Sequence, residues 1–412
     1  MRILRSLIAG LFLLVAAASA QAAPPESPGW HAVWATSAQL PSKAMDPNWS
    51  LTGFSNHTLR QVIRVSQGGL ATRVRLTNRY GTRPLAITGA TIAVTDTGAS
   101  IRPNTLRPLT SGLASAFEIP AGADLVTDPV PLSVAPFQSL TITVYLAEAT
   151  GPATHHAQAF ATTYRTSGDH RADDSGLAFA ETTQAWYYLS GVEVLDMLPH
   201  PSGVVAFGDS ITEGVGSTPN ANHRYPDALA ERLAAEGNPR AVIDQGIGGN
   251  RVTVDSSWLG DSAQHRFRAD VLDQPGIGTV IILAGINDIG LSAPGPGAAD
   301  TVVPVSTDHL IAAHLDLIHQ ARAKGLRVIG ATLTPFGGSP YDSPAAESAR
   351  LAFNNWLRTT APYDALVDFD AALRDPTNLH RLTPTYDSGD HIHPNDTGYT
   401  AMAATLRPTD FA

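Results

Sequence analysis

The sequence has 412 residues, of which 43% are hydrophobic and 16% charged; this composition excludes a disordered chain and allows more than one folded domain. It contains no cysteine, which excludes disulfides, thiolate metal ligands and a cysteine nucleophile. The formal net charge of −10 argues against nucleic acid as a partner and agrees with a neutral substrate.

The first residues have the pattern of a leader. Arg2 and Arg5 precede the apolar run "LIAGLFLLVAAASA", and small residues follow it. This arrangement is typical of a secretory signal peptide over residues 1–22, with cleavage after Ala20 or Ala22. The run is too short to cross a membrane as a helix. We therefore expect an exported protein, periplasmic or extracellular, without a membrane span in its mature form.

Residues 24–200 are predicted to form an all-β domain. Segments such as "RQVIRVS", "TRVRLTN" and "SLTITVYL" alternate apolar and polar residues, and turn-forming residues separate them. Alternation with this period indicates short antiparallel strands, arranged as a β-sandwich or jelly roll.

Aromatic residues and histidines in this part have two interpretations. Trp30, Trp34 and Trp49 are interpreted as core or interdomain aromatics, although they could also form a platform on which sugars stack. His155 and His156 are interpreted as solvated loop residues, with the lining of a shared cleft as the alternative.

From residue 203 to residue 412 the pattern changes to that of an α/β domain. Apolar runs of strand length alternate with helical patterns, and Ser343 and Gly325 occupy positions that predict a helix N-cap and a helix stop. Such strands indicate a parallel sheet covered on both faces, with its functional site beyond the carboxyl ends of the strands. The strands are expected over 204–207, 241–244, 279–284, 327–333 and 365–369, and the helices over 225–236, 308–325 and 343–357.

Ser210 lies three residues beyond the first of these strands, in "AFGDSITEGVG". It is a candidate nucleophile at the sheet edge where a site is expected, and a helix cap is the alternative. The neighbouring Asp209 is interpreted as a structural residue that braces the turn.

Candidate oxyanion donors follow the next two strands. "QGIGGN" (245–250) presents backbone amides, and "AGIND" (284–288) presents the uncharged side-chain amide of Asn287. The alternatives are a tight turn and an Asx-turn cap. "TLTPF" (332–336), after the fourth strand, is expected at the pocket rim, where it would help to select the acyl or alcohol group.

The loop "YDSGDHIHPND" (386–396), which follows the fifth strand and a long connection, supplies a candidate base. Asp390 and His393 are three residues apart, so the carboxylate can reach imidazole Nδ1 and leave Nε2 free as a base. His391 as the base and Asp387 as the orienting residue are close rivals, and a metal site is a further alternative. A helix is expected to begin near Asn395 or Asp396.

These four blocks, in this order, resemble the SGNH hydrolases, also called the GDSL esterase/lipase family. The resemblance covers residue 203 to the end and implies a flavodoxin-like three-layer sheet, with no cofactor and no metal. It implies Ser210 as nucleophile, His393 as base and Asp390 as the residue that orients the base. The Ser210 amide, Gly249 and Asn287 would form the oxyanion hole, with Gly248 as an alternative to Gly249.

The expected function is that of a secreted serine esterase which removes short acyl groups, chiefly acetyl, from carbohydrate. Its substrate would be a small-molecule or polysaccharide ester, and its oligomeric state is left open. A lipase or arylesterase of broad specificity is the alternative. A binding module with an inactive hydrolase half is a third hypothesis, which the complete set of candidate residues argues against.

Overall fold

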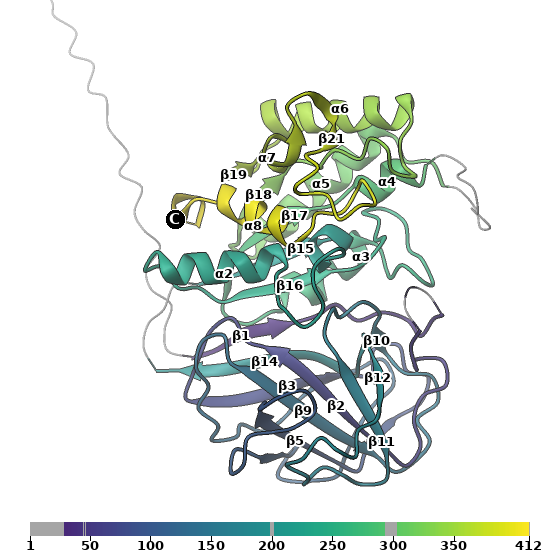
Figure 1. The fold of residues 1–412 in the computed structure, drawn as a ribbon, viewed down its shortest axis with the longest axis vertical. Helices are drawn as coiled ribbons and strands as arrows, with labels where there is room; N and C mark the ends of the chain where they lie inside the picture. The colour runs from purple at the N-terminus through teal and green to yellow at the C-terminus, as the bar shows by residue number, and fades with distance from the viewer. Residues whose placement is uncertain (1–28, 44, 46, 198–201, 293–302, 412) are drawn as a thin grey trace, which may run out of the picture.

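The computed structural model describes residues 29–43, 45, 47–197, 202–292 and 303–411. The chain forms a β-rich N-terminal part and an α/β C-terminal part, which lie against each other (Figure 1). The predicted signal peptide lies outside the described residues. Among the helices described, none combines the length and the apolar character that a membrane crossing requires.

Two antiparallel sheets and two short strand pairs make up the N-terminal part. Its strands are β1 (Gly29–Ala35), β2 (His57–Arg64), β3 (Ala71–Thr77), β4 (Leu85–Ile87), β5 (Gly89–Val94), β6 (Arg107–Leu109), β7 (Phe117–Ile119), β8 (Asp124–Val126), β9 (Ser139–Leu146), β10 (His155–His156), β11 (Thr163–Ser167), β12 (Glu181–Thr183), β13 (Trp186–Tyr187) and β14 (Leu189–Asp196). The four-stranded sheet has the order β1-β14-β3-β8, and the six-stranded sheet has the order β12-β11-β2-β9-β5-β6.

The alternating sequence pattern explains how these two sheets pack. In β3, Val74 and Leu76 are fully buried, whereas Arg73 and Arg75, which alternate with them, are partly exposed. Val74 shares one hydrophobic core with Leu59 and Ile142 of the six-stranded sheet. The structure therefore confirms a β-rich N-terminal domain, and the jelly-roll topology stays a prediction.

Tryptophans of this domain pack as core aromatics, as predicted. Trp34 meets Trp186 edge-on with 4.8 Å between ring centroids, and Trp49 stacks on Tyr187 at 5.7 Å. Trp30 lies against an arginine guanidinium at 4.4 Å.

The prediction of solvated loop histidines is wrong. His155 and His156 form β10 and are 2% and 3% exposed. The ring of His155 stacks on Tyr187 of the same domain, and His156 lies against Glu213 of the C-terminal part. Burial lowers the pKa of His155 to about 4 and that of His156 to about 3. Both imidazoles are therefore neutral at neutral pH.

The C-terminal part is built on a five-stranded parallel sheet, as predicted. Its strands are β15 (Gly203–Gly208), β16 (Val242–Gly246), β17 (Ile277–Leu283), β18 (Arg327–Ala331) and β19 (Ala365–Val367). Their order in the sheet, β16-β15-β17-β18-β19, is the flavodoxin-like order, in which ligands bind at the carboxyl ends beside the first strand.

Helices cover both faces of this sheet. They are α1 (Ser210–Glu213), α2 (Tyr225–Ala235), α3 (Ala263–Phe267), the π-helix η1 (Arg268–Leu272), α4 (Ile286–Gly290), α5 (Thr307–Ala323), α6 (Pro344–Thr359), α7 (Phe369–Leu373), α8 (Asp396–Thr405) and the 3-10 helix η2 (Pro408–Phe411). α2, α7 and α8 pack together, and α3, α5 and α6 form a second group (Figure 1). A short hairpin of β20 (Arg374–Asp375) and β21 (Asn378–Leu382) precedes α8.

Capping residues fix where the helices begin and end. Ser343 Oγ accepts a hydrogen bond from the Ala346 amide, which confirms the predicted N-cap of α6. Asn395 caps α8, as expected for a helix that begins at this point. α5 ends just before Gly325, which adopts a φ of +82°.

Two strands end earlier than their apolar runs predict. β18 ends at Ala331 because Leu333 exchanges its backbone hydrogen bonds with the side chain of Asn354. β19 ends at Val367 because Asp368 caps α7 and accepts from the Ala371 amide.

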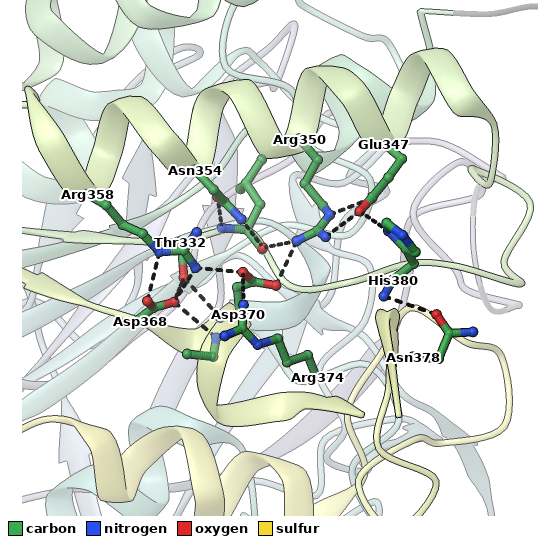
Figure 2. Close-up of polar contacts among 12 residues, drawn as sticks. Thr332, Glu347, Arg350, Asn354, Arg358, Asp368, Asp370, Arg374, Asn378 and His380 are labelled. Carbon is green, nitrogen blue, oxygen red and sulfur yellow. Dashed lines mark hydrogen bonds and ion pairs between the residues drawn. The ribbon is translucent and has the colours of Figure 1, made fainter. Parts of the chain in front are cut away.

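A buried charge cluster attaches α6 to the end of β18 and to α7 (Figure 2). The side chain of Arg350 is 1% exposed and donates to Glu347 at 2.7 Å, to Asp370 at 2.8 Å and to the Leu333 carbonyl at 3.2 Å. Glu347 also contacts His380 of β21 at 2.6 Å. The cluster therefore fixes the hairpin from which the chain continues into the 386–396 loop.

Arg350→Ala is expected to destabilise the fold by about 3 kcal/mol, because it removes a buried guanidinium that Glu347 and Asp370 share, while Glu347 keeps His380 and Asp370 keeps Arg358. Arg268→Ala is the matched control, since the Arg268–Asp273 pair is 81% and 47% exposed; it should cost less than about 1 kcal/mol. Urea unfolding of the two variants and the wild type measures the difference. Equal losses would show that the buried cluster contributes no more than a surface ion pair.

Candidate active site

Ser210 is the first residue of α1, directly beyond the carboxyl end of β15. Asp209 provides the N-cap, because its side chain accepts from the Ile211 amide at 3.1 Å. The alternative in which Ser210 caps the helix is therefore wrong, and the structural role predicted for Asp209 is confirmed. A Cβ on Gly208 would lie 2.2 Å from the Leu283 carbonyl oxygen, so this turn needs glycine.

Three side chains from distant parts of the sequence form one hydrogen-bonded chain. His393 Nε2 lies 2.7 Å from Ser210 Oγ, and His393 Nδ1 lies 2.6 Å from Asp390 Oδ2. Partial burial would raise the pKa of Asp390, but the hydrogen bond and charge of His393 outweigh it and hold that pKa well below its usual range. A carboxylate that stays ionised keeps Nδ1 protonated, which leaves Nε2 to accept a proton from the serine.

The 386–396 loop is folded so that His393 keeps this position. Asp390 Oδ1 accepts from the backbone amides of Ile392 at 3.0 Å and His393 at 2.9 Å. The Ser388 amide donates to the His393 carbonyl at 3.0 Å. The carboxylate therefore fixes both the backbone and the ring of His393.

The rival pair is present but points elsewhere. His391 Nδ1 contacts Asp387 Oδ2 at 2.6 Å, the same distance as in the first pair, although these residues are four apart in the sequence and those of the first pair three. The His391 side chain is 48% exposed, and neither residue lines the pocket that contains Ser210. The structure brings His393 to the serine and leaves His391 in contact with solvent.

The histidines and carboxylates of this loop pair with each other and do not gather around one point. Across the described ranges, the one group whose ligand atoms lie close enough for a metal ion is formed by Asp255, Asp261 and His265. This group lies in a different loop from the one for which sequence reasoning raised a metal site.

Asn287, in α4, presents its amide to the pocket. Its Nδ2 donates one hydrogen to the Asn250 carbonyl at 2.9 Å, and its Oδ1 accepts from the Tyr341 hydroxyl at 2.8 Å. These contacts fix the amide plane and leave the second Nδ2 hydrogen available for a ligand. The alternative role as an Asx-turn cap is not observed, since Asn287 has no side-chain capping bond in α4.

The glycine loop after β16 lies beside Ser210. Gly248 and Gly249 both line the pocket, and Gly249 adopts a φ of +70°. A Cβ on Gly248 would lie 2.9 Å from Glu213 Oε2 and 2.3 Å from Gln158 Oε1. A side chain at position 248 would therefore displace the ends of these two side chains.

Arg266 connects these parts and was not found from the sequence. Its guanidinium donates to the Gly208 carbonyl at 2.7 Å, to the Gln245 carbonyl at 2.8 Å and to Asn250 Oδ1 at 3.0 Å. It also donates to Ser37 Oγ of the N-terminal domain at 3.0 Å. A single arginine in a polar helix gives no sequence signal for burial, so only the folded chain reveals this role.

The pocket beside Ser210 has a volume of about 350 Å³. Both domains line it, because Met45 and Gln158 come from the N-terminal domain. The residues 332–336 do not line it, contrary to prediction; Pro340 and Tyr341, a few positions further along the chain, occupy the rim. The remaining lining residues are Ser210, Val215, Gly248, Gly249, Trp258, Leu259, Asn287, Leu291, Asp390, Ile392 and His393.

Several carboxyl groups are buried below this site. Burial raises the pKa of Asp209 to about 7 and that of Asp244 to about 7, and it raises the pKa of Glu213 well above its usual range. These three carboxyl groups therefore stay protonated at pH values at which exposed carboxyl groups are ionised.

Residues 206–401 match the model of the GDSL-like lipase/acylhydrolase family. This part of the chain is a GDSL-like lipase/acylhydrolase domain. Lipases and acylhydrolases cleave carboxylic esters, and the protein is accordingly a carboxylic ester hydrolase.

The acylhydrolase domain is also similar to domains of solved structures. One is the acetyl xylan esterase AlAXEase, with 22% sequence identity and a TM-score of 0.38; the match covers 50% of this chain and 96% of that chain. Another is a carbohydrate acetylesterase family member from Sinorhizobium meliloti, with 15% identity and a TM-score of 0.39; the match covers 50% of this chain and 96% of that chain. A lipase/acylhydrolase from Enterococcus faecalis is similar too, with 20% identity and a TM-score of 0.38; the match covers 50% of this chain and 92% of that chain. No curated protein is similar enough to the chain to match it.

Asp209→Asn is expected to stabilise the acylhydrolase domain more at high pH than at low pH. The folded pKa of about 7 lies above the ordinary 3.8, so folding takes up a proton between these values and wild-type stability falls as the pH rises through that range. Asparagine keeps the cap without the charge.

Urea unfolding at about pH 5 and about pH 8 measures this effect. The free energy of unfolding of the variant, relative to that of the wild type, should rise by on the order of 2–3 kcal/mol from the lower pH to the higher. A difference that does not change with pH would contradict a buried, proton-holding Asp209.

Proposed function

We propose that the protein is an exported serine esterase that removes short acyl groups, chiefly acetyl, from carbohydrate. The observation that carries the proposal is the continuous hydrogen-bonded chain from Ser210 Oγ through His393 to Asp390 at the pocket. A serine hydroxyl is a weak nucleophile until a base accepts its proton, and this geometry provides that base in position.

In the first half of the reaction, His393 Nε2 accepts the proton as Ser210 Oγ attacks the ester carbonyl carbon. The tetrahedral intermediate collapses, the alcohol leaves with the proton from His393, and the acyl group remains on Ser210. Water, deprotonated by His393, then attacks the acyl-enzyme, and His393 returns that proton to Ser210 Oγ as the carboxylic acid leaves. Asp390 stabilises the imidazolium in both halves.

The developing oxyanion is held by the Ser210 amide, the Gly249 amide and the side-chain amide of Asn287. The Ser210 amide is in the first turn of α1 and has no partner within the helix. Asn287 has one amide hydrogen left for a ligand. Gly249 is preferred to Gly248 because the Gly248 amide is directed towards the carboxyl group of Glu213.

The size of the site favours a small ester. About 350 Å³ is near the lower end of the volumes of small-molecule sites. Such a pocket accepts a short acyl group together with part of the alcohol. Export would place the enzyme where extracellular acetylated glycans occur, and the net charge of −10 does not oppose a neutral polymer.

The two Asp–His pairs of the 386–396 loop allow a matched test of the base. His393→Asn should lower kcat/KM on nitrophenyl acetate by at least about 1,000-fold, because Ser210 loses its proton acceptor. His391→Asn should stay within a few-fold of wild type; asparagine tolerates the φ of +68° at this position. Ser210→Ala should abolish turnover. Loss of activity in His391→Asn together with retention in His393→Asn would overturn the assignment.

A series of nitrophenyl esters tests the acyl length. Acetyl should be the preferred group, and octanoyl esters should be turned over more slowly, because a pocket of about 350 Å³ that also admits part of the alcohol leaves little room for a long acyl chain. Release of acetate from acetylated xylan is the companion measurement. A preference for octanoyl esters would instead identify a lipase or arylesterase, and no turnover of any ester would identify a binding module.

A further inference from the structure

A segment of the N-terminal domain around Gln158 is fixed against the acylhydrolase domain. On one side of Gln158, His156 Nδ1 bonds to the Ser37 carbonyl at 2.9 Å, and His156 Nε2 lies 3.3 Å from Glu213 Oε1. Glu213 is the last residue of the helix that begins with Ser210. The position of this segment is therefore tied to the helix that carries the nucleophile.

The other side of Gln158 is fixed as well. The Asn220 amide donates to the Phe160 carbonyl at 2.8 Å, and Asn220 Oδ1 accepts from the Thr162 amide at 2.8 Å. The Ala157 amide donates to Gln39 Oε1 at 2.8 Å. Gln158 thus lies on a short stretch of backbone that both domains hold in place.

The Gln158 side chain lines the pocket and has an unused hydrogen-bonding capacity. Its Oε1 lies so close to Gly248 that a Cβ there would be 2.3 Å away, which places the amide over the glycine loop next to Ser210. Within the described ranges, no residue forms a hydrogen bond with this side chain. Two N–H donors and one carbonyl acceptor remain for a ligand.

We propose that Gln158 is a specificity-determining residue that binds a hydroxyl group of the substrate. A hydroxyl both donates and accepts, and a primary amide complements it in both directions. The preferred substrates would then be esters of polyhydroxy alcohols in which a free hydroxyl is next to the ester. This inference rests on the proposed esterase function and deepens it, since it assigns part of the substrate site to the N-terminal domain.

Rigid backbone on both sides gives the interaction its selectivity. A side chain positioned before the substrate arrives loses less conformational entropy on binding. A site that is built to bind a hydroxyl discriminates against an analogue without it, because its polar groups then lose their partner.

The test uses two esters that differ by one hydroxyl: cyclohexyl acetate and hydroxycyclohexyl acetate, with the hydroxyl on the carbon next to the ester. The quantity measured is the ratio of kcat/KM for the hydroxylated ester to kcat/KM for the plain ester. In Gln158→Leu this ratio should fall about tenfold, the usual value of one neutral hydrogen bond. Gln67→Leu, at the separate cleft between the domains, should leave both values unchanged.

An unchanged ratio in Gln158→Leu overturns the proposal. This includes an equal fall of kcat/KM for both esters, because lost packing would affect both alike. Gln158→Met, which keeps the length of the side chain, replaces the leucine variant if that one does not fold.

Failure of the esterase function gives a different result. In that case the wild-type protein hydrolyses neither ester. Calorimetric binding of hydroxycyclohexyl acetate to Ser210→Ala, with and without Gln158→Leu, then measures the Gln158 contact without catalysis. Equal affinities in the two proteins would overturn the proposed contact.

Discussion

The guanidinium of Arg266 connects the end of β15 to the end of β16 and the glycine loop that follows it, two of the segments that form the candidate active site. It binds the carbonyl of Gly208 at the end of β15, that of Gln245 at the end of β16, and the side chain of Asn250 in the glycine loop. Asn250 in turn accepts from Asn287. Hydrogen bonds to Arg266, made directly or through Asn250, therefore fix the segments that carry the proposed nucleophile and oxyanion donors.

A buried cation at this point also sets the electrostatics of the site floor. Asp270 balances the charge of Arg266 at 2.9 Å, and the same cation opposes the rise in the pKa values of Asp209 and Asp244 that burial causes. The floor can therefore contain several carboxyl groups without a net negative charge directly below Ser210. A strong negative potential there would disfavour the developing oxyanion.

Much of the acylhydrolase domain could be predicted because its signals are local. Apolar runs that alternate with capped helices specify a parallel sheet, and that topology brings Ser210, Asn287 and the 386–396 loop to one edge. The choice of His393 over His391 depended on the family resemblance, since both histidines have an aspartate at matching distance. Chain geometry, and not residue type, separates the two.

What could not be predicted lies where the two domains meet. Arg266, His156 and Gln158 belong to segments whose own sequence is polar, so the patterns favour exposure. Contacts across the domain boundary, such as Arg266 with Ser37 and His156 with Glu213, help to fix these residues. The pattern of either segment alone does not predict such contacts. A different limit applies to residues 332–336, where side-chain hydrogen bonds from α6 of the same domain end the strand early, and Tyr341 occupies the rim.

A pocket shared between domains separates bond cleavage from recognition. The proposed nucleophile and its base belong to one domain, whereas Gln158 and Met45 belong to the other. Substitutions in the segment around Gln158 could therefore redirect the enzyme to other alcohols while the reacting groups keep their geometry. In evolution or in engineering, the N-terminal domain could serve as an exchangeable part that adapts one conserved chemistry to new esters.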